Sequence, residues 1–318
     1  MNTCSTQGSS PIRPHRYVLM TAAYNEELHI EKTITSVLQQ TLRPERWMIV
    51  SDGSTDRTNE IIERYASQHD FIRFLRLTRA PGHSFSSKVV ALNKGLVLIK
   101  GTPFDFIGNL DADVSVGPTY FEQLMKQFET SPQLGLASGF VHEEIEGEFH
   151  SRTSNRTDSV PHAAQLVRRA CWEAIGGYAI LKYGGEDWHA QTCAKMRGWD
   201  VAAIPRLKIF HHRHTGAGTN LMAHRFRLGR LDYSFGSDPI FEMFKCLRRI
   251  LEQPMLIGGL TRFAGFMWSC IQRESRVVST EFIEFLRVEQ KEKVVGLFSK
   301  VYTARTAAAS RLTDSGPV

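Results

Sequence analysis

Short apolar segments alternate with segments of helical periodicity over the first 115 residues of the chain. The apolar segments are continuously hydrophobic, which is typical of strands that are buried on both faces of a sheet. Such strands run parallel and are connected by helices, so the pattern predicts a parallel sheet covered by helices on both faces. The predicted strands are residues 16–22, 46–52, 72–77 and 104–113, and the predicted helices are 26–40, 54–69 and 86–101.

Three aspartates stand where predicted strands end. Asp52 ends the second strand, and Asp111 and Asp113 close the fourth. Because the carboxyl ends of parallel strands share one edge of the sheet, we expect the three carboxylates to converge there, where such folds bind ligands. One aspartate can serve as a helix N-cap, but a cap requires only one carboxylate. Two carboxylates one residue apart are suitable ligands for Mg²⁺ or Mn²⁺, although this spacing alone also occurs by chance.

Further motifs surround these aspartates. The sequence YNEE (24–27) opens the first predicted helix, DGSTD (52–56) turns from the second strand into its helix, and Lys88 lies near a helix N-terminus that could hold phosphate. In this order and at these separations, VLMTAAYNEE, IVSDGSTD, KVVALNKG, NLDADV, IGGY and GGEDW resemble the family 2 glycosyltransferases of the GT-A fold. The resemblance covers about two thirds of the chain, residues 16–215, and implies an α/β fold with a Rossmann-like, mostly parallel sheet flanked by helices.

The resemblance also implies a role for each motif at the donor side. The segment from Ala22 to Glu26, with Tyr24, would line the base and ribose pocket of a nucleotide-diphosphate sugar. The family's usual proline ahead of the Tyr-Asn pair is Ala22 here, a difference that leaves the expected pocket in place. Asp52 would accept a hydrogen bond from the base, and Lys88 would lie near the base or the phosphates.

The same resemblance implies a divalent cation. Asp113 would bind the Mg²⁺ or Mn²⁺ that carries the diphosphate, and Asp111 would face the ribose or the metal. The turn HHRHTG (211–216) resembles a metal- or diphosphate-binding turn of some family members, in which His211 would be a ligand and Arg213 could contact a phosphate. A histidine at such a place is also commonly only a polar surface residue.

The acceptor side is implied by GGEDWHAQ (184–191), which matches the family's ED motif. Asp187 would be the general base that takes the proton from the acceptor hydroxyl, which permits in-line attack with inversion at the anomeric carbon. Glu186 would support Asp187 or contact the acceptor, and Trp188 could stack on a sugar ring. The alternatives are that Asp187 caps the helix that follows and that Trp188 packs in the core.

The chain changes character beyond about residue 134. Residues 142–162 are polar and predict a mobile loop, and the last hundred residues predict amphipathic helices. We therefore expect a C-terminal α-helical appendage on the GT-A domain. The predicted divisions are a disordered lead at 1–15, the GT-A domain at 16–218, the helical region at 219–305 and a disordered tail at 306–318.

The helical region is basic as well as amphipathic, which favours contact with a membrane surface. Its basic residues would meet anionic headgroups, and its large apolar residues would enter the interface. The alternatives are that these helices pack on the GT-A core or form a dimer. The residues expected at a membrane are Arg225, Arg227, Arg230, Lys245, Arg248 and Arg249, with Phe241, Phe244, Met267 and Trp268.

Composition narrows the expected setting of the protein. The net charge of +6 suits an anionic ligand or an anionic membrane without proving either. The five cysteines are odd in number and in no CxxC spacing, which argues against a disulfide framework or a zinc site and favours a reducing compartment. The sequence shows no secretory signal and no uninterrupted apolar segment long enough to span a bilayer. We expect a cytoplasmic protein, peripheral on the inner face of the plasma membrane if it binds one, with no nucleic-acid partner.

The leading hypothesis is a metal-dependent, inverting glycosyltransferase that moves one sugar from a nucleotide-diphosphate donor to a hydroxyl of a lipid-linked or surface-polysaccharide glycan. The Q-x-x-R-W motif and the spans of processive polysaccharide synthases are missing, which favours one transfer per encounter. The alternative is a catalytically inactive protein that binds a nucleotide sugar or a glycan. A nucleotidyltransferase is disfavoured because TAAYNEE is not a glycine-rich phosphate loop, and a dinucleotide oxidoreductase is excluded because no G-x-G-x-x-G follows the first strand.

Overall fold

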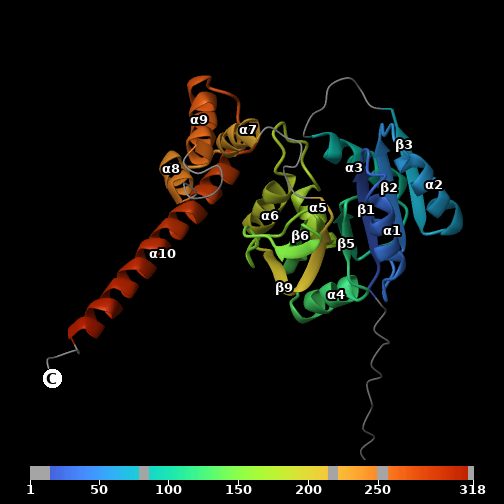
Figure 1. Ribbon diagram of the computed structural model, residues 1–318, viewed down its shortest axis with the longest axis horizontal. Helices are drawn as coiled ribbons and strands as arrows, with labels where there is room; N and C mark the ends of the chain where they lie inside the picture. The colour runs from blue at the N-terminus through green and yellow to red at the C-terminus, as the bar shows by residue number, and fades with distance from the viewer. Residues whose placement is uncertain (1–14, 79–85, 214–220, 249–256, 314–318) are drawn as a thin grey trace, which may run out of the picture. The chain divides into compact units, whose positions relative to one another are not determined.

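The computed structural model describes residues 15–78, 86–213, 221–248 and 257–313 of the chain (Figure 1). These residues form two compact units. The first contains residues 15–78, 88–177 and 199–212, and the second contains residues 86–87, 178–198 and those described from 213 onwards. Of the segments predicted to be disordered, residues 1–14 and 314–318 lie outside the described residues. Residues 306–313 belong to a helix that ends at Thr313, so the prediction of a disordered tail is wrong for them.

The first unit is built on a nine-stranded sheet, and its first four strands confirm the predicted parallel arrangement. They lie side by side in the order β3-β2-β1-β4 (Figure 1). A helix follows each of the first three strands, as parallel pairing requires. The strands are β1 (Tyr17–Ala23), β2 (Arg46–Asp52), β3 (Ile72–Leu77) and β4 (Phe106–Leu110), and the helices are α1 (Ile30–Leu38), α2 (Thr58–Gln68) and α3 (Ser87–Leu98).

The later strands make the sheet mixed. β8 pairs antiparallel with β4 and with β6, β6 pairs parallel with β9, and β9 pairs antiparallel with β5. The sheet therefore continues from β4 through β8, β6 and β9 to β5, all of which follow Asp111 and Asp113 in the sequence. The remaining elements of this unit are β5 (Val114–Val116), α4 (Tyr120–Thr130), β6 (Leu134–Ile145), β7 (Glu148–Ser151), β8 (Ala164–Arg168), α5 (Arg169–Ile175) and β9 (Asp200–His211).

The prediction of a mobile loop over residues 142–162 is wrong in its first half, because residues 142–145 and 148–151 pair as a β6–β7 hairpin. The turn consists of Glu146 and Gly147, whose φ angles of 52° and 85° are both positive, as a two-residue hairpin turn requires. Phe149 of this hairpin packs edge-on against Phe210 of β9, with ring centroids 5.0 Å apart. Phe149 also packs edge-on against His212, with ring centroids 5.6 Å apart, and the polar composition of the segment concealed these anchoring contacts.

Buried polar contacts fix the spacing of the strands that carry the site. Trp47 Nε1 in β2 donates to Thr21 Oγ1 in β1 at 2.9 Å, and the Thr21 hydroxyl donates to the Leu110 carbonyl in β4 at 2.6 Å. Gly108 lies in the middle of β4, where a Cβ would stand 2.7 Å from the Gln165 carbonyl of β8. These contacts hold β1, β2 and β4 so that their carboxyl ends stay in register.

The second unit is helical and confirms the predicted C-terminal appendage. α7 and α9 cross at two glycines: a Cβ at Gly229 would clash with the Arg262 carbonyl, and one at Gly265 would clash with the Phe226 carbonyl. Among the described residues, no helix combines the length and the apolar character that crossing a bilayer requires. The helices are α6 (Glu186–Met196), α7 (Leu221–Ser234), α8 (Pro239–Arg248), α9 (Ile257–Ile271) and α10 (Thr280–Thr313).

Candidate functional site

The carboxyl ends of β1, β2 and β4 meet along one edge of the sheet in the first unit. β1 lies between the other two strands, with Ala23 opposite Ser51 of β2 and Met20 opposite Asn109 of β4. Asp52 is the last residue of β2, and Asp111 follows the last residue of β4 directly. The sheet thus places Asp52 and Asp111 on either side of the chain that leaves β1.

The YNEE and DGSTD segments bind each other at this edge. The backbone N–H of Asn25 donates to Ser54 Oγ at 3.1 Å, and Asn25 Oδ1 accepts from the Thr55 N–H at 2.9 Å. The Glu26 N–H donates to Thr58 Oγ1 at 2.7 Å. Asn25 has a φ of 53°, a left-handed conformation that asparagine tolerates better than most residues.

These contacts leave the predicted base-pocket residues in different environments. Tyr24 is 42% exposed at the head of the loop, so its ring is available to a planar ligand. Ala22 and Glu26 are half-buried, and Asp52 is half-buried beside Gly53, whose φ is 76°. The structure therefore brings Ala22, Tyr24, Glu26 and Asp52 together at one place, and their roles towards a ligand stay predictions.

Asp111 is held by a cation and an amide. Lys88 Nζ, in the first turn of α3, lies 2.6 Å from Asp111 Oδ1, and Asn109 Nδ2 donates to the same oxygen at 2.8 Å. Burial and the neighbouring Asp113 raise the pKa of Asp111, and Lys88 opposes them without cancelling the rise. Lys88 was expected near the base or the phosphates, and the structure shows it paired with Asp111.

Asp113 has a histidine as its neighbour instead. β5 begins directly after Asp113, and its pairing with β9 sets Val114 opposite His211. This pairing brings His211 Nε2 to 3.4 Å from Asp113 Oδ2. Burial lowers the pKa of His211, but the hydrogen bond and charge of Asp113 outweigh that effect and raise it. The two predicted metal ligands thus meet, although nearly 100 residues of sequence separate them.

The donors of Asp113 and His211 fit a divalent cation. One carboxylate and one imidazole 3.4 Å apart are close enough to share an ion. The carboxylate suits Mg²⁺ or Mn²⁺, and imidazole is a common ligand of divalent transition metals. Within the described part of the chain, no group of three or more acidic, histidine or cysteine side chains gathers as a metal cluster. Such an ion would therefore take its remaining ligands from water and substrate oxygens, as is usual for Mg²⁺.

Polar residues outside the predicted set complete this edge. The ring Nε2 of His212 lies 2.8 Å from Ser115 Oγ, and the backbone N–H of His212 donates to the Asp113 carbonyl at 2.9 Å. These two contacts stabilise the loop that carries Asp113. Arg152 of the strand-like segment after β7 pairs with the buried Glu143 at 2.5 Å and tends to lower the pKa of His211. The polar Asn109 inside an apolar strand was a signal that sequence reasoning passed over.

The residues of the ED motif lie in the second unit. Glu186 and Asp187 form the first turn of α6, after Gly184 and Gly185 with φ angles of 80° and 88°. Asp187 Oδ1 accepts from the Trp188 N–H at 2.7 Å, but the N-cap position is Gly185, so the expected alternative of Asp187 as N-cap does not hold. Both acids stand in the first turn of α6, where a negative charge interacts favourably with the helix dipole.

Trp188 packs against the apolar core of the second unit, which was the alternative to stacking on a sugar ring. Its ring lies 4.6 Å from that of Phe235, and Lys245 Nζ lies 5.7 Å from its centroid on another side. The surrounding apolar cluster consists of Leu181, Tyr183, Leu231, Phe235, Phe282 and Leu286. These contacts account for the tryptophan without a sugar ring.

The sequence profile described as "Glycosyl transferase family 2" matches residues 19–186, more than half of the chain. Among curated proteins, the chain is 35% identical over 118 residues to the poly-beta-1,6-N-acetyl-D-glucosamine synthase of Staphylococcus aureus strain COL, and 33% identical over 118 residues to that of Staphylococcus epidermidis. Each match covers 37% of this chain and 26% of the relative, so the chain matches only about a quarter of their length.

Two solved structures are similar in fold. One is the mannosyltransferase PcManGT from Pyrobaculum calidifontis in complex with GDP-Man and Mn²⁺, with a TM-score of 0.53 and 17% identity, covering 96% of this chain and 89% of that one. The other is S. aureus TarS, with a TM-score of 0.50 and 14% identity, covering 75% of this chain and 44% of that one. At these identities the likeness shows the fold alone.

Proposed function

Because the chain belongs to glycosyl transferase family 2, we propose that it transfers a single sugar from a nucleotide-diphosphate donor to a hydroxyl acceptor, with inversion and with the help of Mg²⁺ or Mn²⁺. The observation that carries this proposal is the pairing of Asp113 with His211 beside Asp111 and Lys88, at the sheet edge where α/β folds bind ligands. The alternative of an inactive binding protein is an outcome of the experiment below.

The donor is held by the residues at the ends of β1 and β2. Tyr24 offers an exposed ring for the base, Asp52 a carboxylate to accept a base N–H, and the half-buried Ala22 and Glu26 form the wall behind the ribose. The loop is stiffened by the contacts of Asn25, so these groups are positioned before the donor arrives. The side chains around this loop determine which base and which sugar the protein accepts in the donor.

The diphosphate is placed by Asp113 and His211. These two residues would hold the cation, with Asp111 contacting it or the ribose through the oxygen that Lys88 leaves open. A bound divalent ion stabilises the negative charge that develops on a departing phosphate. Only a neutral imidazole can be a metal ligand, and Asp113 raises the pKa of His211, so binding of a cation here should strengthen as pH rises.

The acceptor hydroxyl is deprotonated by Asp187, with Glu186 as its support or as an acceptor contact. Both carboxylates lie in the first turn of α6, and a carboxylate is a suitable general base for an acceptor hydroxyl. The acceptor is a lipid-linked or surface-polysaccharide glycan, a proposal supported by relatives named as poly-N-acetylglucosamine synthases. We place the protein in the cytoplasm, where nucleotide sugars are the available donors.

The test is a transfer assay with a panel of nucleotide sugars and glycan acceptors, in Mg²⁺ and in Mn²⁺. Asp113→Asn and Asp187→Asn should each reduce turnover by at least about a hundredfold without changing the melting temperature. Asp70→Asn is the matched control, because Asp70 lies exposed just before β3, at the opposite edge of the sheet. Tight donor binding with no transfer or hydrolysis in the wild type would favour the inactive alternative, and normal turnover of Asp187→Asn would remove Asp187 as the base.

A further inference from the structure

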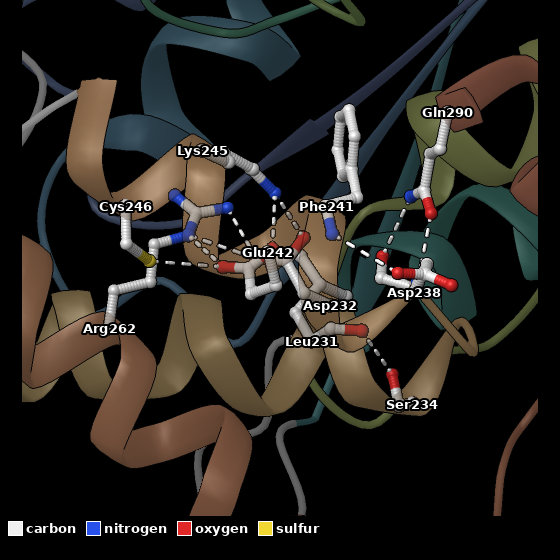
Figure 2. Close-up of polar contacts among 11 residues, drawn as sticks. Leu231, Asp232, Ser234, Asp238, Phe241, Glu242, Lys245, Cys246, Arg262 and Gln290 are labelled. Carbon is white, nitrogen blue, oxygen red and sulfur yellow. Dashed lines mark hydrogen bonds and ion pairs between the residues drawn. The ribbon is translucent and has the colours of Figure 1, made fainter. Parts of the chain in front are cut away.

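Helix α8 turns its charged side inwards. Glu242 is fully buried, and its Oε1 accepts from Arg262 Nε of α9 at 3.2 Å and from Cys246 Sγ at 3.5 Å (Figure 2). Arg262 also donates twice to Asp232 Oδ2 of α7, at 2.9 and 2.6 Å. Lys245 Nζ lies 2.7 Å from Asp232 Oδ1 and 3.2 Å from Glu242 Oε2. Four charged groups therefore occupy the centre of the three-helix contact.

This inner network of Asp232, Glu242, Lys245 and Arg262 balances two carboxylates against two cations (Figure 2). Burying charges is costly even when they are paired, and an apolar contact of the same volume would often be at least as stable. An amphipathic helix in a water-soluble unit normally packs its apolar face and exposes its charged face. Helix α8 instead buries its charged face and exposes its apolar face, which indicates an environment other than water for the apolar face.

The outer side of α8 is apolar and exposed to solvent. Ile240, Phe244 and Leu247 follow one another at helical spacing and are 63%, 40% and 53% exposed. α9 continues the pattern with Leu260, Trp268 and Ile271, which are 66%, 49% and 71% exposed, while its Arg262 and Phe266 face inwards. We call the six exposed residues Ile240, Phe244, Leu247, Leu260, Trp268 and Ile271 the outer face. The two helices pack on each other, since a Cβ at Gly259 would stand 2.9 Å from the Cys246 carbonyl.

Charge on these helices has one sign at the surface. Glu242 is the single acidic residue of α8 and is buried in the inner network, and α9 has no acidic residue. Arg248 is exposed in the last turn of α8, and Arg273 is exposed just beyond α9. Within α8 and α9, a half-exposed tryptophan lies among aliphatic residues, arginines stand near the ends and no carboxylate is exposed. This is the composition of a surface that meets anionic lipid headgroups.

We propose that the outer face docks on an anionic lipid surface, with α8 and α9 lying in the plane of the interface. The structure also narrows the basic residues expected there, because Arg227 binds the Tyr183 carbonyl, Arg230 binds Glu274 and Lys245 belongs to the inner network. Of the other expected residues, Arg225 is half-buried, Arg249 lies outside the described residues and Arg248 is exposed. The exposed Arg273, which was not among the expected residues, supplies a second cation at this surface. Docking is independent of the proposed transfer reaction, and its test uses no activity.

The experiment is flotation of the full chain with phosphatidylcholine vesicles that contain or lack phosphatidylglycerol. Binding should require the anionic lipid and weaken with salt, and Leu260→Gln or Phe244→Gln should each reduce partitioning by about tenfold. Arg248→Gln should weaken binding to anionic vesicles by about fivefold, the loss expected for one interfacial cation. Val97→Gln is the matched control, because Val97 is 68% exposed on α3 of the first unit.

Insertion is checked by quenching of Trp268 fluorescence with brominated lipid, using Trp268→Phe as the blank. Since the substituted side chains are exposed, the variants should keep the wild-type melting temperature. Light scattering at the same protein concentrations distinguishes a second copy of the chain from lipid. Absence of binding to anionic vesicles, equal binding by Leu260→Gln and the wild type, or a dimer that Leu260→Gln dissociates would each overturn the proposal.

Discussion

Replacing Arg262 with methionine is the sharpest test of the inner network. Arg262 makes three hydrogen bonds to two buried carboxylates, to Asp232 at 2.9 and 2.6 Å and to Glu242 at 3.2 Å. Methionine fills similar space but leaves two carboxylates against Lys245 alone. Removing one partner of a buried ion pair costs about 3–5 kcal/mol, because the remaining charge is buried without compensation. We expect a loss of that size for Arg262→Met in urea unfolding of the full chain.

The loss should depend on pH. Burial raises the pKa of Glu242, whereas Lys245 and Arg262 outweigh burial at Asp232 and lower its pKa. Without Arg262, the pKa of Glu242 rises further. A carboxyl whose pKa is higher in the folded state stabilises the fold at low pH and loses that contribution as pH rises through the folded pKa. The destabilisation of Arg262→Met should therefore be larger at about pH 8 than at about pH 5.

Two further variants complete this experiment. Glu242→Gln in the Arg262→Met background restores charge balance between Asp232 and Lys245, so the double variant should be more stable than the sum of the single losses predicts. Arg169→Met is the control, because the Arg169–Glu173 pair is exposed and should contribute less than about 1 kcal/mol. A loss below about 1 kcal/mol for Arg262→Met, equal at both pH values and additive with Glu242→Gln, would refute the reasoning.

Three other predictions concern the first unit. Asp113→Asn should lower the pKa of His211, measured by NMR titration, because the Asp113 carboxylate is the cause of its rise against burial; an unchanged pKa would separate the two residues. Lys88→Met should lower the free energy of unfolding in urea by about 1–3 kcal/mol, because it leaves the partly buried Asp111 carboxylate without its paired cation. An unchanged midpoint would contradict the pairing. Asp56→Ala should cost about 1 kcal/mol, because Asp56 accepts from the Thr58 N–H at the start of α2 and from the Glu27 N–H. Hydrogen bonds lower the pKa of Asp56 against burial, so this cost should disappear as pH falls through that pKa, and a cost that persists in acid would contradict the role of these hydrogen bonds.

The edge that carries the site could be predicted because it follows from local pattern. Continuously apolar strands such as residues 17–23 and 106–110 are typical of a buried parallel sheet. The aspartates stand where two of these strands end, at Asp52 and after Leu110. The neighbours of each carboxylate could not be predicted. Lys88 reaches Asp111 from the start of α3, and His211 reaches Asp113 only through the β5–β9 pairing. Such contacts depend on tertiary register, which spacing along the chain does not contain.

The helical region shows the opposite situation. The amphipathic pattern of α8 predicted a helix correctly, but a hydrophobic pattern alone does not say which face is buried. Glu242 is buried because Arg262, twenty residues later, and Lys245, three residues later, neutralise it (Figure 2). The hairpin at residues 142–151 was missed for a related reason, since Phe149 finds its partner Phe210 far along the chain.

The most direct test of the proposed function is calorimetric titration of nucleotide-diphosphate sugars into the protein, with and without Mn²⁺. Wild type should bind one donor tightly only with the metal. Asp113→Asn should lose the metal-dependent part of the affinity, and Asp70→Asn should keep it. Equal donor binding by Asp113→Asn and wild type, or donor binding that is independent of metal in both, would contradict the assignment of Asp113 and His211 to the diphosphate.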